Sequence, residues 1–323
     1  MHSVQELQAL FEARFAEDPF ATFPSTLYDP LRYTLGVRGK RIRPLLCLMG
    51  SELFDEITPD SFHAAVALEM FHNFTLIHDD ILDHAPLRRG QPTAHHKFGM
   101  PAALLGGDVL LVYAYEQINR IGKLHLSRIL DLFNKVAIQV CEGQQLDMDF
   151  ETMDPALIPM KDYMDMIERK TSVLLAASIQ IGAVLGGASA GNAMHLYEFG
   201  KRLGMSFQVQ DDLLDIFGDP GQVGKTPGGD ILTGKKTFLL LKAMELCPPH
   251  QAGALAELIR SNRPDRVEKV MEIYSDCRIA EWAEREKEKF AREALDQLDQ
   301  VAVLSSRKAP LRELAWMLLQ RTS

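Results

Sequence analysis

Two short stretches of the sequence each carry three aspartates at a spacing that suits a divalent cation. They read HDDILD, from residue 78, and QDDLLD, from residue 210. On a helix the first and third aspartates of this pattern lie four residues apart and share a face, while the second points about 100° away. The aspartates are Asp79, Asp80 and Asp83 in the first stretch and Asp211, Asp212 and Asp215 in the second.

The residues around both aspartate clusters are largely apolar, which predicts that the clusters lie partly inside the protein. FTLIHDDIL surrounds the first, and GMSFQVQ precedes the second. Buried carboxylates are costly without counter-charge, and metal ions between the two clusters would supply it. Ligands that are all oxygen favour Mg²⁺, which is typically held by a few carboxylates and substrate phosphates. A di-iron site is disfavoured because it needs Glu-x-x-His pairs, and no Glu lies three residues before His78 or His84.

Positive charge occurs in small clusters beside Gly, Pro or Thr rather than along amphipathic faces. Arginine suits bidentate contacts to phosphate, and lysine acts as a point charge. The glycines in VGKTPGGD and TGKKT do not form a P-loop, because neither stretch matches GxxxxGK[ST]. The clusters therefore predict binding of a compact anion such as a diphosphate. Their cations are Lys40, Arg43, Arg88, Arg89, Lys170, Lys225 and Lys235.

Two further polar residues share helix faces with the aspartates. His72 lies seven residues before Asp79, only about 20° from its face, and Gln208 precedes Asp211 by three residues. Both are therefore predicted to border the acidic clusters. Taken alone, His72 would be interpreted as a core histidine with a hydrogen-bond partner.

The elements that must position these residues are helices. Apolar residues recur at spacings of three and four over long stretches, whereas alternation typical of strands is scarce. The sequence predicts an all-α bundle of many long helices, and no linker rich in Gly, Ser or Pro divides residues 1–323 into domains. The periodic stretches are residues 4–15, 64–83, 106–121, 126–151, 193–217 and 266–298.

Composition narrows the class of protein. A hydrophobic share of 46% excludes intrinsic disorder, and a net charge of −9 with no long basic run argues against a nucleic-acid partner. Four dispersed cysteines and the absence of a signal-peptide pattern predict a cytoplasmic protein. Residues 174–194 carry no charge and reach transmembrane length, but they include Gln180 and a Gly/Ala/Ser cluster. A buried helix followed by a loop is therefore favoured over a transmembrane segment.

The motifs together resemble those of the trans-isoprenyl diphosphate synthases, also called the polyprenyl synthetase family. The resemblance covers roughly residues 30–240, and the ordered set is far more specific than a single DDxxD. The motifs are GKRIRP, LIHDDILD with LRRGQPTAH, EGQQLD, RKT, FQVQDDLLD and GGDILTGKKT. One departure is Arg38, which stands where the family commonly has the first Gly of Gly-Gly-Lys-Arg.

The resemblance implies a fold and a reaction. The fold would be one large domain of mostly antiparallel helices around a central cavity, the isoprenoid synthase fold. The reaction would join isopentenyl diphosphate to an allylic diphosphate by ionisation, condensation and elimination, with three Mg²⁺ ions. Members of the family are usually homodimers, so a homodimer is expected.

The resemblance also implies residue roles. Asp79, Asp83 and Asp211 would bind metal, with Asp215 as a further ligand, directly or through water, and Asp80 and Asp212 in support. The residues expected to hold the allylic diphosphate are Arg88, Lys170, Lys225 and Lys235. Those expected to hold isopentenyl diphosphate are Lys40, Arg43, His72 and Arg89. Thr171 and Gln208 would face the carbocation, and with Lys170 and the metal ligands they complete the predicted catalytic set.

Product length depends in this family on the fourth and fifth residues before the first aspartate motif, which are Thr75 and Phe74. A single aromatic residue there, with an unmodified DDILD, is typical of synthases that make a C20 product, and C15 is the second possibility. Thr75 shares the helical face of Asp79, whereas Phe74 points about 140° away. A helix bend or a neighbouring helix must therefore bring Phe74 to the product cavity.

Two alternatives to a chain-elongating enzyme stay open. A class I terpene cyclase would share one aspartate motif, but it would not need a second diphosphate site such as GKRIRP. A non-catalytic subunit of a heteromeric prenyl synthase would tend to lose aspartates or lysines that are present here. The sequence does not identify the allylic primer, the exact chain length or the downstream pathway.

Overall fold

The computed structural model describes residues 1–37, 39–218 and 228–320. Arg38 and Lys225 lie outside the described residues. The chain forms two compact units. Unit 1 contains Met1–Asn134, Ala177–Tyr197 and Val301–Leu311, and unit 2 contains Lys135–Ala176, Glu198–Gln300 and Arg312–Ser323. The single domain over residues 1–323 and its central cavity stay predictions.

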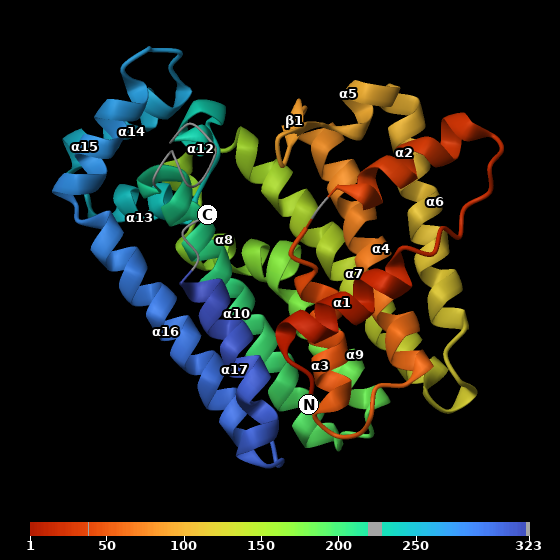
Figure 1. Ribbon diagram of the computed structural model, residues 1–323. Coiled ribbons are helices and arrows are strands. Elements are labelled where there is room, and N and C mark those ends of the chain that lie inside the picture. Colours follow the sequence, from red (N-terminus) through yellow and green to blue (C-terminus); the bar gives the residue numbers. More distant parts are fainter. Residues whose placement is uncertain (38, 219–227, 321–323) are drawn as a thin grey trace. The chain divides into compact units, whose positions relative to one another are not determined.

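The all-α class is confirmed, since long helices make up most of the described chain (Figure 1). In chain order the elements are α1 (Val4–Phe15), α2 (Ser25–Gly36), α3 (Ile42–Glu52), α4 (Pro59–Leu82), β1 (Leu87–Arg88), β2 (Gln91–Pro92), α5 (Ala94–Phe98), α6 (Met100–Asn119), α7 (Lys123–Thr152), η1 (Pro155–Leu157), α8 (Met160–Ile167), η2 (Glu168–Ser172), α9 (Val173–Leu185), α10 (Ala190–Phe217), α12 (Gly229–Thr233), α13 (Phe238–Leu246), α14 (Pro249–Arg260), α15 (Arg266–Asp276), α16 (Ile279–Gln300) and α17 (Ser305–Leu319).

Helix α4 is the central helix of unit 1 and carries the first aspartate motif. It begins sharply because Thr58 and Ser61 form a capping box around Pro59, a residue suited to a first helical turn. Its buried side packs against α3 and α6, which lie beside it in Figure 1. The motif at its far end is thus held on a rigid element.

The uncharged stretch at residues 174–194 forms a buried helix followed by a loop, as predicted. Helix α9 ends at Leu185, Gly187 adopts a left-handed φ of 84°, and α10 begins at Ala190. A Cβ on Gly182 would lie 1.8 Å from the carbonyl oxygen of Cys47 in α3, so the two backbones touch there. No helix of the described chain is both long and apolar enough to cross a membrane.

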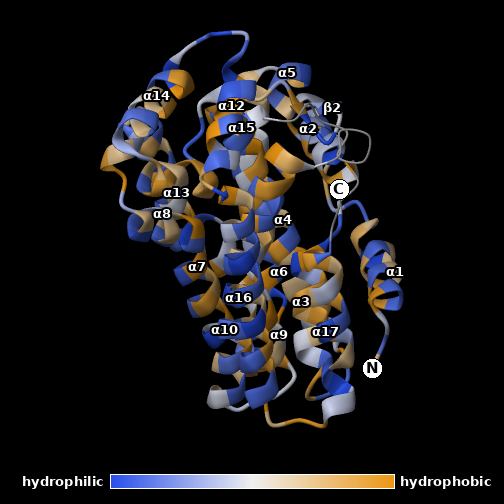
Figure 2. Cartoon of the chain, turned by 90° about the vertical axis from the view of Figure 1, so that its left-hand side faces the viewer, coloured by the Kyte–Doolittle hydropathy of each residue, from blue (hydrophilic) through white to orange (hydrophobic). Residues whose placement is uncertain are grey.

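Unit 2 has its own core around the C-terminal half of α10, with α13, α15 and α16. Thr237 caps α13 by accepting a hydrogen bond from the amide of Leu240, and Phe238 stacks on Trp282 of α16 at 4.6 Å. Figure 2 shows hydrophilic residues along α16, whose apolar side buries residues such as Phe290 and Leu298. This core supports the second aspartate motif.

Two local features differ from the periodicity of the sequence. The stretch at residues 266–298 forms two helices, because Arg278 adopts a left-handed φ of 51° between α15 and α16. No Gly or Pro marks this break. In addition, Glu168–Ser172 forms the π-helical turn η2, a rare conformation that is frequent at functional sites.

Candidate active site

The three aspartates of the first motif, at the end of α4, differ in how deeply they are buried. Asp80 is buried, Asp79 is partly buried and Asp83 is exposed. Arg88 closes over the two inner carboxylates: its Nε donates to Asp80 Oδ1 at 2.8 Å and its Nη2 to Asp79 Oδ2 at 3.2 Å. Burial raises the pKa of Asp80 to about 6, although Arg88 opposes that shift. Asp79 and Asp83 are therefore the more accessible carboxylates for a cation.

A short hairpin after α4 brings Arg88 back to the motif. Strands β1, labelled in Figure 1, and β2 pair in antiparallel register. Leu87 lies opposite Pro92. The tight turn between them uses left-handed backbone at Arg89 and Gly90, with φ of 53° and 74°. The sequence motif LRRGQP thus encodes a turn that places two adjacent arginines beside α4.

A cationic cluster surrounds His72, two turns before Asp79 on α4. Arg43 Nη1 lies 3.0 Å from His72 Nε2. Since arginine can only donate, the imidazole accepts through Nε2 and carries its proton on Nδ1. Burial, and then the charges of Arg43, Arg89, Arg88 and Arg41, lower the pKa of His72 well below its usual range.

The same cluster contains a hydrogen-bond donor that is available to an anion. Burial lowers the pKa of Arg43 to about 10, which leaves the guanidinium charged at neutral pH. Its Nε is buried and has no hydrogen-bond partner among the described residues. Gly39 brings Arg89 into this cluster, because a Cβ at Gly39 would stand 2.5 Å from Arg89 Nη1. Lys40, the next residue, is exposed beside it.

The pKa of His72 leads to a testable pH dependence. The unfolded chain takes up a proton near the ordinary histidine pKa of 6.5, whereas the folded protein resists it. The free energy of unfolding should therefore fall as pH drops below about 6.5, by at most about 1.4 kcal/mol per pH unit for one proton. We expect His72→Gln to flatten this dependence between pH 7.5 and 5.5, measured by thermal melting without substrate. His250→Gln, at an exposed position, should leave it unchanged; identical slopes for wild type and His72→Gln would contradict the assignment.

The second aspartate motif lies near the end of α10 in unit 2. Asp212 is buried and accepts hydrogen bonds from Gln208 Nε2 at 2.9 Å and from the amide of Phe238 at 3.0 Å. Burial and repulsion from Asp230 raise the pKa of Asp212 to about 7. Asp211, by contrast, is partly exposed. Asp212 thus ties α10 to α13, and Asp211 is the more exposed of the two carboxylates.

Asp215 has a structural partner as well as its predicted role. Its Oδ2 accepts from the amide of Asp230 at 2.9 Å, at the start of α12. Gly229 makes this approach possible, because a Cβ there would stand 3.0 Å from Asp215 Oδ1. The placement of Asp215 as a metal ligand stays a prediction. Lys235 is exposed. Its positive charge partly opposes the rise in the pKa of Asp212, so Lys235 lies near the second motif.

The π-helical turn η2 presents Lys170 and Thr171. Lys170 Nζ donates to Asp147 Oδ2 at 2.6 Å, and Thr171 Oγ1 lies 3.4 Å from Gln208 Oε1. The turn approaches α7 so closely that a Cβ on Gly143 would stand 2.2 Å from the amide nitrogen of Lys170. Unit 2 therefore brings the predicted residues Lys170, Thr171 and Gln208 together with the second motif.

Sequence reasoning assigned no role to two acidic residues that organise unit 2. Asp147 is buried and holds Lys170. Asp230 raises the pKa of Asp212, and its amide donates to Asp215. Both belong to motifs quoted above, EGQQLD and GGDILTGKKT. The aspartate within each of these two motifs is the sequence feature that could have indicated these roles.

Phe74 and Thr75 both lie on α4. Phe74 is buried and packs against Phe71 at 5.6 Å and His78 at 4.7 Å between ring centroids. The hydroxyl of Thr75 donates to the carbonyl of His72 on its own helix at 2.8 Å. Their role in product length stays a prediction.

Comparison with known proteins gives a consistent family. The polyprenyl synthetase family model matches residues 24–277. A short chain isoprenyl diphosphate synthase of Methanocaldococcus jannaschii is 39% identical over 252 residues, which cover 76% of each chain. A crystal structure of geranylgeranyl pyrophosphate synthase matches with a TM-score of 0.94 and 36% identity over 100% of both chains.

A further solved structure is that of a complex. It is geranylgeranyl pyrophosphate synthase from Corynebacterium glutamicum complexed with isoprenyl diphosphate and magnesium, with a TM-score of 0.83 and 29% identity over 98% of this chain and 96% of that one. The family model covers most of the chain, and the relatives agree with it. The chain therefore belongs to the polyprenyl synthetase family and is an isoprenyl diphosphate synthase, a prenyltransferase.

Proposed function

We propose that this enzyme condenses isopentenyl diphosphate with an allylic diphosphate, in the presence of Mg²⁺, to give a trans-polyprenyl diphosphate of 20 carbons. One observation carries the proposal: two neighbouring polar sets of opposite character border α4. The set around His72 is cationic and includes Arg43, while the set at Asp79 is acidic. The first suits a diphosphate bound directly and the second a diphosphate bound through metal.

The two sets account for two different substrates. Isopentenyl diphosphate keeps its diphosphate, so direct contacts from Lys40, Arg43, His72 and Arg89 suffice. The allylic diphosphate must depart, and its site needs charge where the leaving group becomes more negative. A terpene cyclase needs only the second kind of site.

The donor set of the two aspartate motifs fits Mg²⁺. Asp79, Asp83, Asp211 and Asp215 would hold the ions, of which the family resemblance suggests three. Among the described residues, no three Asp, Glu, His or Cys side chains form a ready-made metal group. Mg²⁺ typically keeps several waters and binds substrate phosphates as well as carboxylates. Bound Mg²⁺ would supply positive charge to the departing pyrophosphate.

The side chains of the protein then control the three bond changes. The allylic C1–O bond breaks and leaves both electrons on pyrophosphate, whose charge Arg88, Lys170 and Lys235 would counter. The double bond of isopentenyl diphosphate forms the new C–C bond while the oxygens of Thr171 and Gln208 lie beside the cation. A proton then passes to pyrophosphate, and the product is five carbons longer. Lys225 is proposed to join the allylic diphosphate site, although it lies outside the described residues.

We also propose a homodimer. Helix α6 of unit 1 exposes several large apolar side chains, which monomeric proteins seldom gather on one helix. They are Leu104, Leu105, Val112 and Tyr115. Sedimentation of the purified protein should give twice the chain mass of 36.2 kDa; a monomer at micromolar concentration would exclude the proposal.

Product length is proposed to depend on Phe74. We expect Phe74→Ala to shift the products beyond 20 carbons, because the change removes the aromatic ring that would stop the growing chain. Mass spectrometry of the dephosphorylated products measures the distribution. A Phe→Ala change in a core costs about 3–5 kcal/mol, so product ratios rather than rates are compared. Phe199→Leu, at a fully buried site in unit 2, is the control; an unchanged distribution in Phe74→Ala would remove Phe74 as the stop.

Incubation with substrates tests the function as a whole. Purified protein with Mg²⁺, isopentenyl diphosphate and either dimethylallyl or farnesyl diphosphate should yield geranylgeranyl diphosphate. Cyclised hydrocarbons would instead mean a terpene cyclase, and a lack of turnover would mean a non-catalytic subunit.

A further inference from the structure

Arg41 lies inside the segment that carries Lys40 and Arg43, yet its side chain serves a different purpose from theirs. It is only 6% exposed, whereas Lys40 is exposed. Its backbone φ of 50° lies in the left-handed region, and its carbonyl accepts the first hydrogen bond of α3, from Leu45. Left-handed backbone is uncommon for a residue with a side chain. Other contacts must therefore hold this turn in place.

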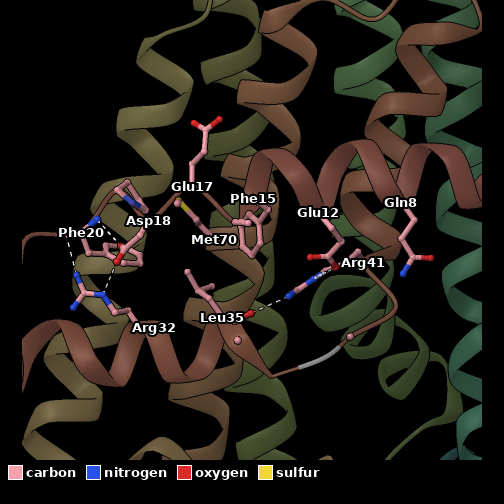
Figure 3. Close-up of a pocket in the computed structure, with 14 residues that line it drawn as sticks. Gln8, Glu12, Phe15, Glu17, Asp18, Phe20, Arg32, Leu35, Arg41 and Met70 are labelled. Atoms are coloured by element: carbon pink, nitrogen blue, oxygen red, sulfur yellow. Dashed lines mark hydrogen bonds and ion pairs between the residues drawn. The ribbon is translucent and has the colours of Figure 1, made fainter.

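The guanidinium of Arg41 uses all three of its nitrogens to connect three helices. Nε donates to Glu12 Oε1 of α1 at 3.1 Å, Nη1 to Glu69 Oε1 of α4 at 2.6 Å, and Nη2 to the carbonyl of Leu35 of α2 at 2.9 Å. The group also lies over the ring of Phe15, 4.9 Å from its centroid. Figure 3 shows Arg41 with its dashed contacts to Glu12 and Leu35, beside Phe15.

Glu69, on α4, links the contacts of Arg41 to the cationic set around His72. Its side chain is only 5% exposed, and its Oε1 also accepts from Asn73 Nδ2 at 3.1 Å. His72 lies one turn further along the same helix. The carboxylate that fixes Arg41 is thus set into the stretch of α4 that presents His72 to Arg43.

We propose that Arg41 is a positioning residue for isopentenyl diphosphate. Held by Glu69 and Glu12, it fixes the turn at residues 40–43 so that Lys40 and Arg43 already point at the diphosphate before it binds. The N-terminal helix α1 contributes to substrate affinity through Glu12, although it carries no substrate ligand. The inference rests on the proposed function, which assigns isopentenyl diphosphate to Lys40, Arg43, His72 and Arg89.

Preorganisation of this kind changes the affinity for one substrate in particular. A loose turn has to be ordered on binding, which weakens the complex. The allylic diphosphate is assigned to other residues, so its KM should change little. A purely structural role for Arg41 would instead lower the amount of folded enzyme, or change kcat and both KM values together.

Two variants keep the buried charges balanced. Arg41→Lys retains the positive charge beside Glu69, but an ammonium cannot reach all three acceptors as the planar guanidinium does. We expect the KM for isopentenyl diphosphate to rise about tenfold, with kcat and the allylic KM within about twofold, since small misplacements weaken oriented contacts strongly. Glu12→Gln affects a carboxylate that is 44% exposed, so the fold should survive, and the same KM should rise about threefold.

Glu17→Gln is the matched control. Glu17 lines the same pocket as Glu12 and Arg41 (Figure 3), but it is 66% exposed and pairs with Arg14. All kinetic constants should stay at wild-type values. Calorimetric titration of each variant with isopentenyl diphosphate alone measures the affinity for this substrate independently of KM.

The outcomes separate this inference from the proposed function. If Lys40→Ala leaves the KM for isopentenyl diphosphate unchanged, the binding-site assignment is wrong and the positioning role is overturned with it. If Lys40→Ala raises that KM while Arg41→Lys and Glu12→Gln do not, only the positioning role is overturned. A parallel change of kcat and both KM values in Arg41→Lys would also overturn it.

Discussion

Asp211→Asn is expected to lower kcat by about 1,000-fold, the upper end of the effect that follows removal of a key electrostatic group from a transition state. Asn keeps the shape of the side chain and removes its charge. Asp211 is the partly exposed acid of the second motif, whereas Asp212 is engaged by Gln208 and Phe238. The charge lost is therefore the one proposed to hold Mg²⁺. Steady-state assays over a range of Mg²⁺ concentrations should also show a higher requirement for the metal.

Asp212→Asn gives the contrasting pattern. Its carboxylate accepts two hydrogen bonds inside unit 2, and Asn can accept only through one oxygen. We expect a clear loss of thermal stability with a smaller loss of kcat, about tenfold. Asp131→Asn, on the exposed side of α7, should change neither. Equal kcat in Asp211→Asn and wild type would mean that the second motif is not a metal site.

Lys170→Met is expected to lower kcat by about 100-fold or more, because the ammonium is proposed to counter the charge of departing pyrophosphate. The variant alone is ambiguous. Lys170 also neutralises Asp147, whose side chain is 9% exposed, and an unpaired buried charge is strongly destabilising. A loss of activity could therefore follow from a loss of folded protein.

The double variant Lys170→Met/Asp147→Asn resolves the ambiguity. Removing both charges should restore thermal stability towards the wild-type value while kcat stays low. Lys161→Met, at an exposed position on α8, is the matched control and should retain full activity. Recovery of kcat in the double variant would mean that Lys170 serves only to neutralise Asp147.

Local patterns in the sequence were sufficient to predict the helices that carry the site. The first periodic stretch coincides with α1 (Val4–Phe15), and the stretches at residues 64–83 and 193–217 lie within or at the edge of α4 and α10. These helices are amphipathic or capped by residues close in sequence, so the information is local. The shared faces within each DDxxD motif follow from helical spacing alone.

Contacts between distant residues could not be predicted in the same way. Glu69 lies 28 residues from Arg41, and no sequence pattern near either residue predicts that they form an ion pair. The left-handed break at Arg278 has no Gly or Pro to mark it. The π-helical turn at Lys170 depends on the close approach of Gly143 from α7. In each case tertiary packing overrides the local preference of the chain.

The partner of each aspartate was also beyond local reasoning. Helical spacing and the family resemblance singled out Asp79, Asp83 and Asp211 as metal ligands, but neither predicted which residues hold the buried acids. Asp80 is held by Arg88 and Asp212 by the amide of Phe238. These contacts explain why Asp80 and Asp212 are the least exposed acids of their motifs.

We propose that the two motifs act together on one diphosphate through shared divalent ions. Mn²⁺ can replace Mg²⁺ as a paramagnetic probe, so electron paramagnetic resonance can count the ions that bind when inorganic pyrophosphate is added. We expect pyrophosphate-dependent Mn²⁺ binding in wild type and its loss in both single variants, Asp79→Asn and Asp211→Asn. If either variant keeps the full wild-type complement of bound Mn²⁺ and pyrophosphate, the motifs do not share the ions and the account is contradicted.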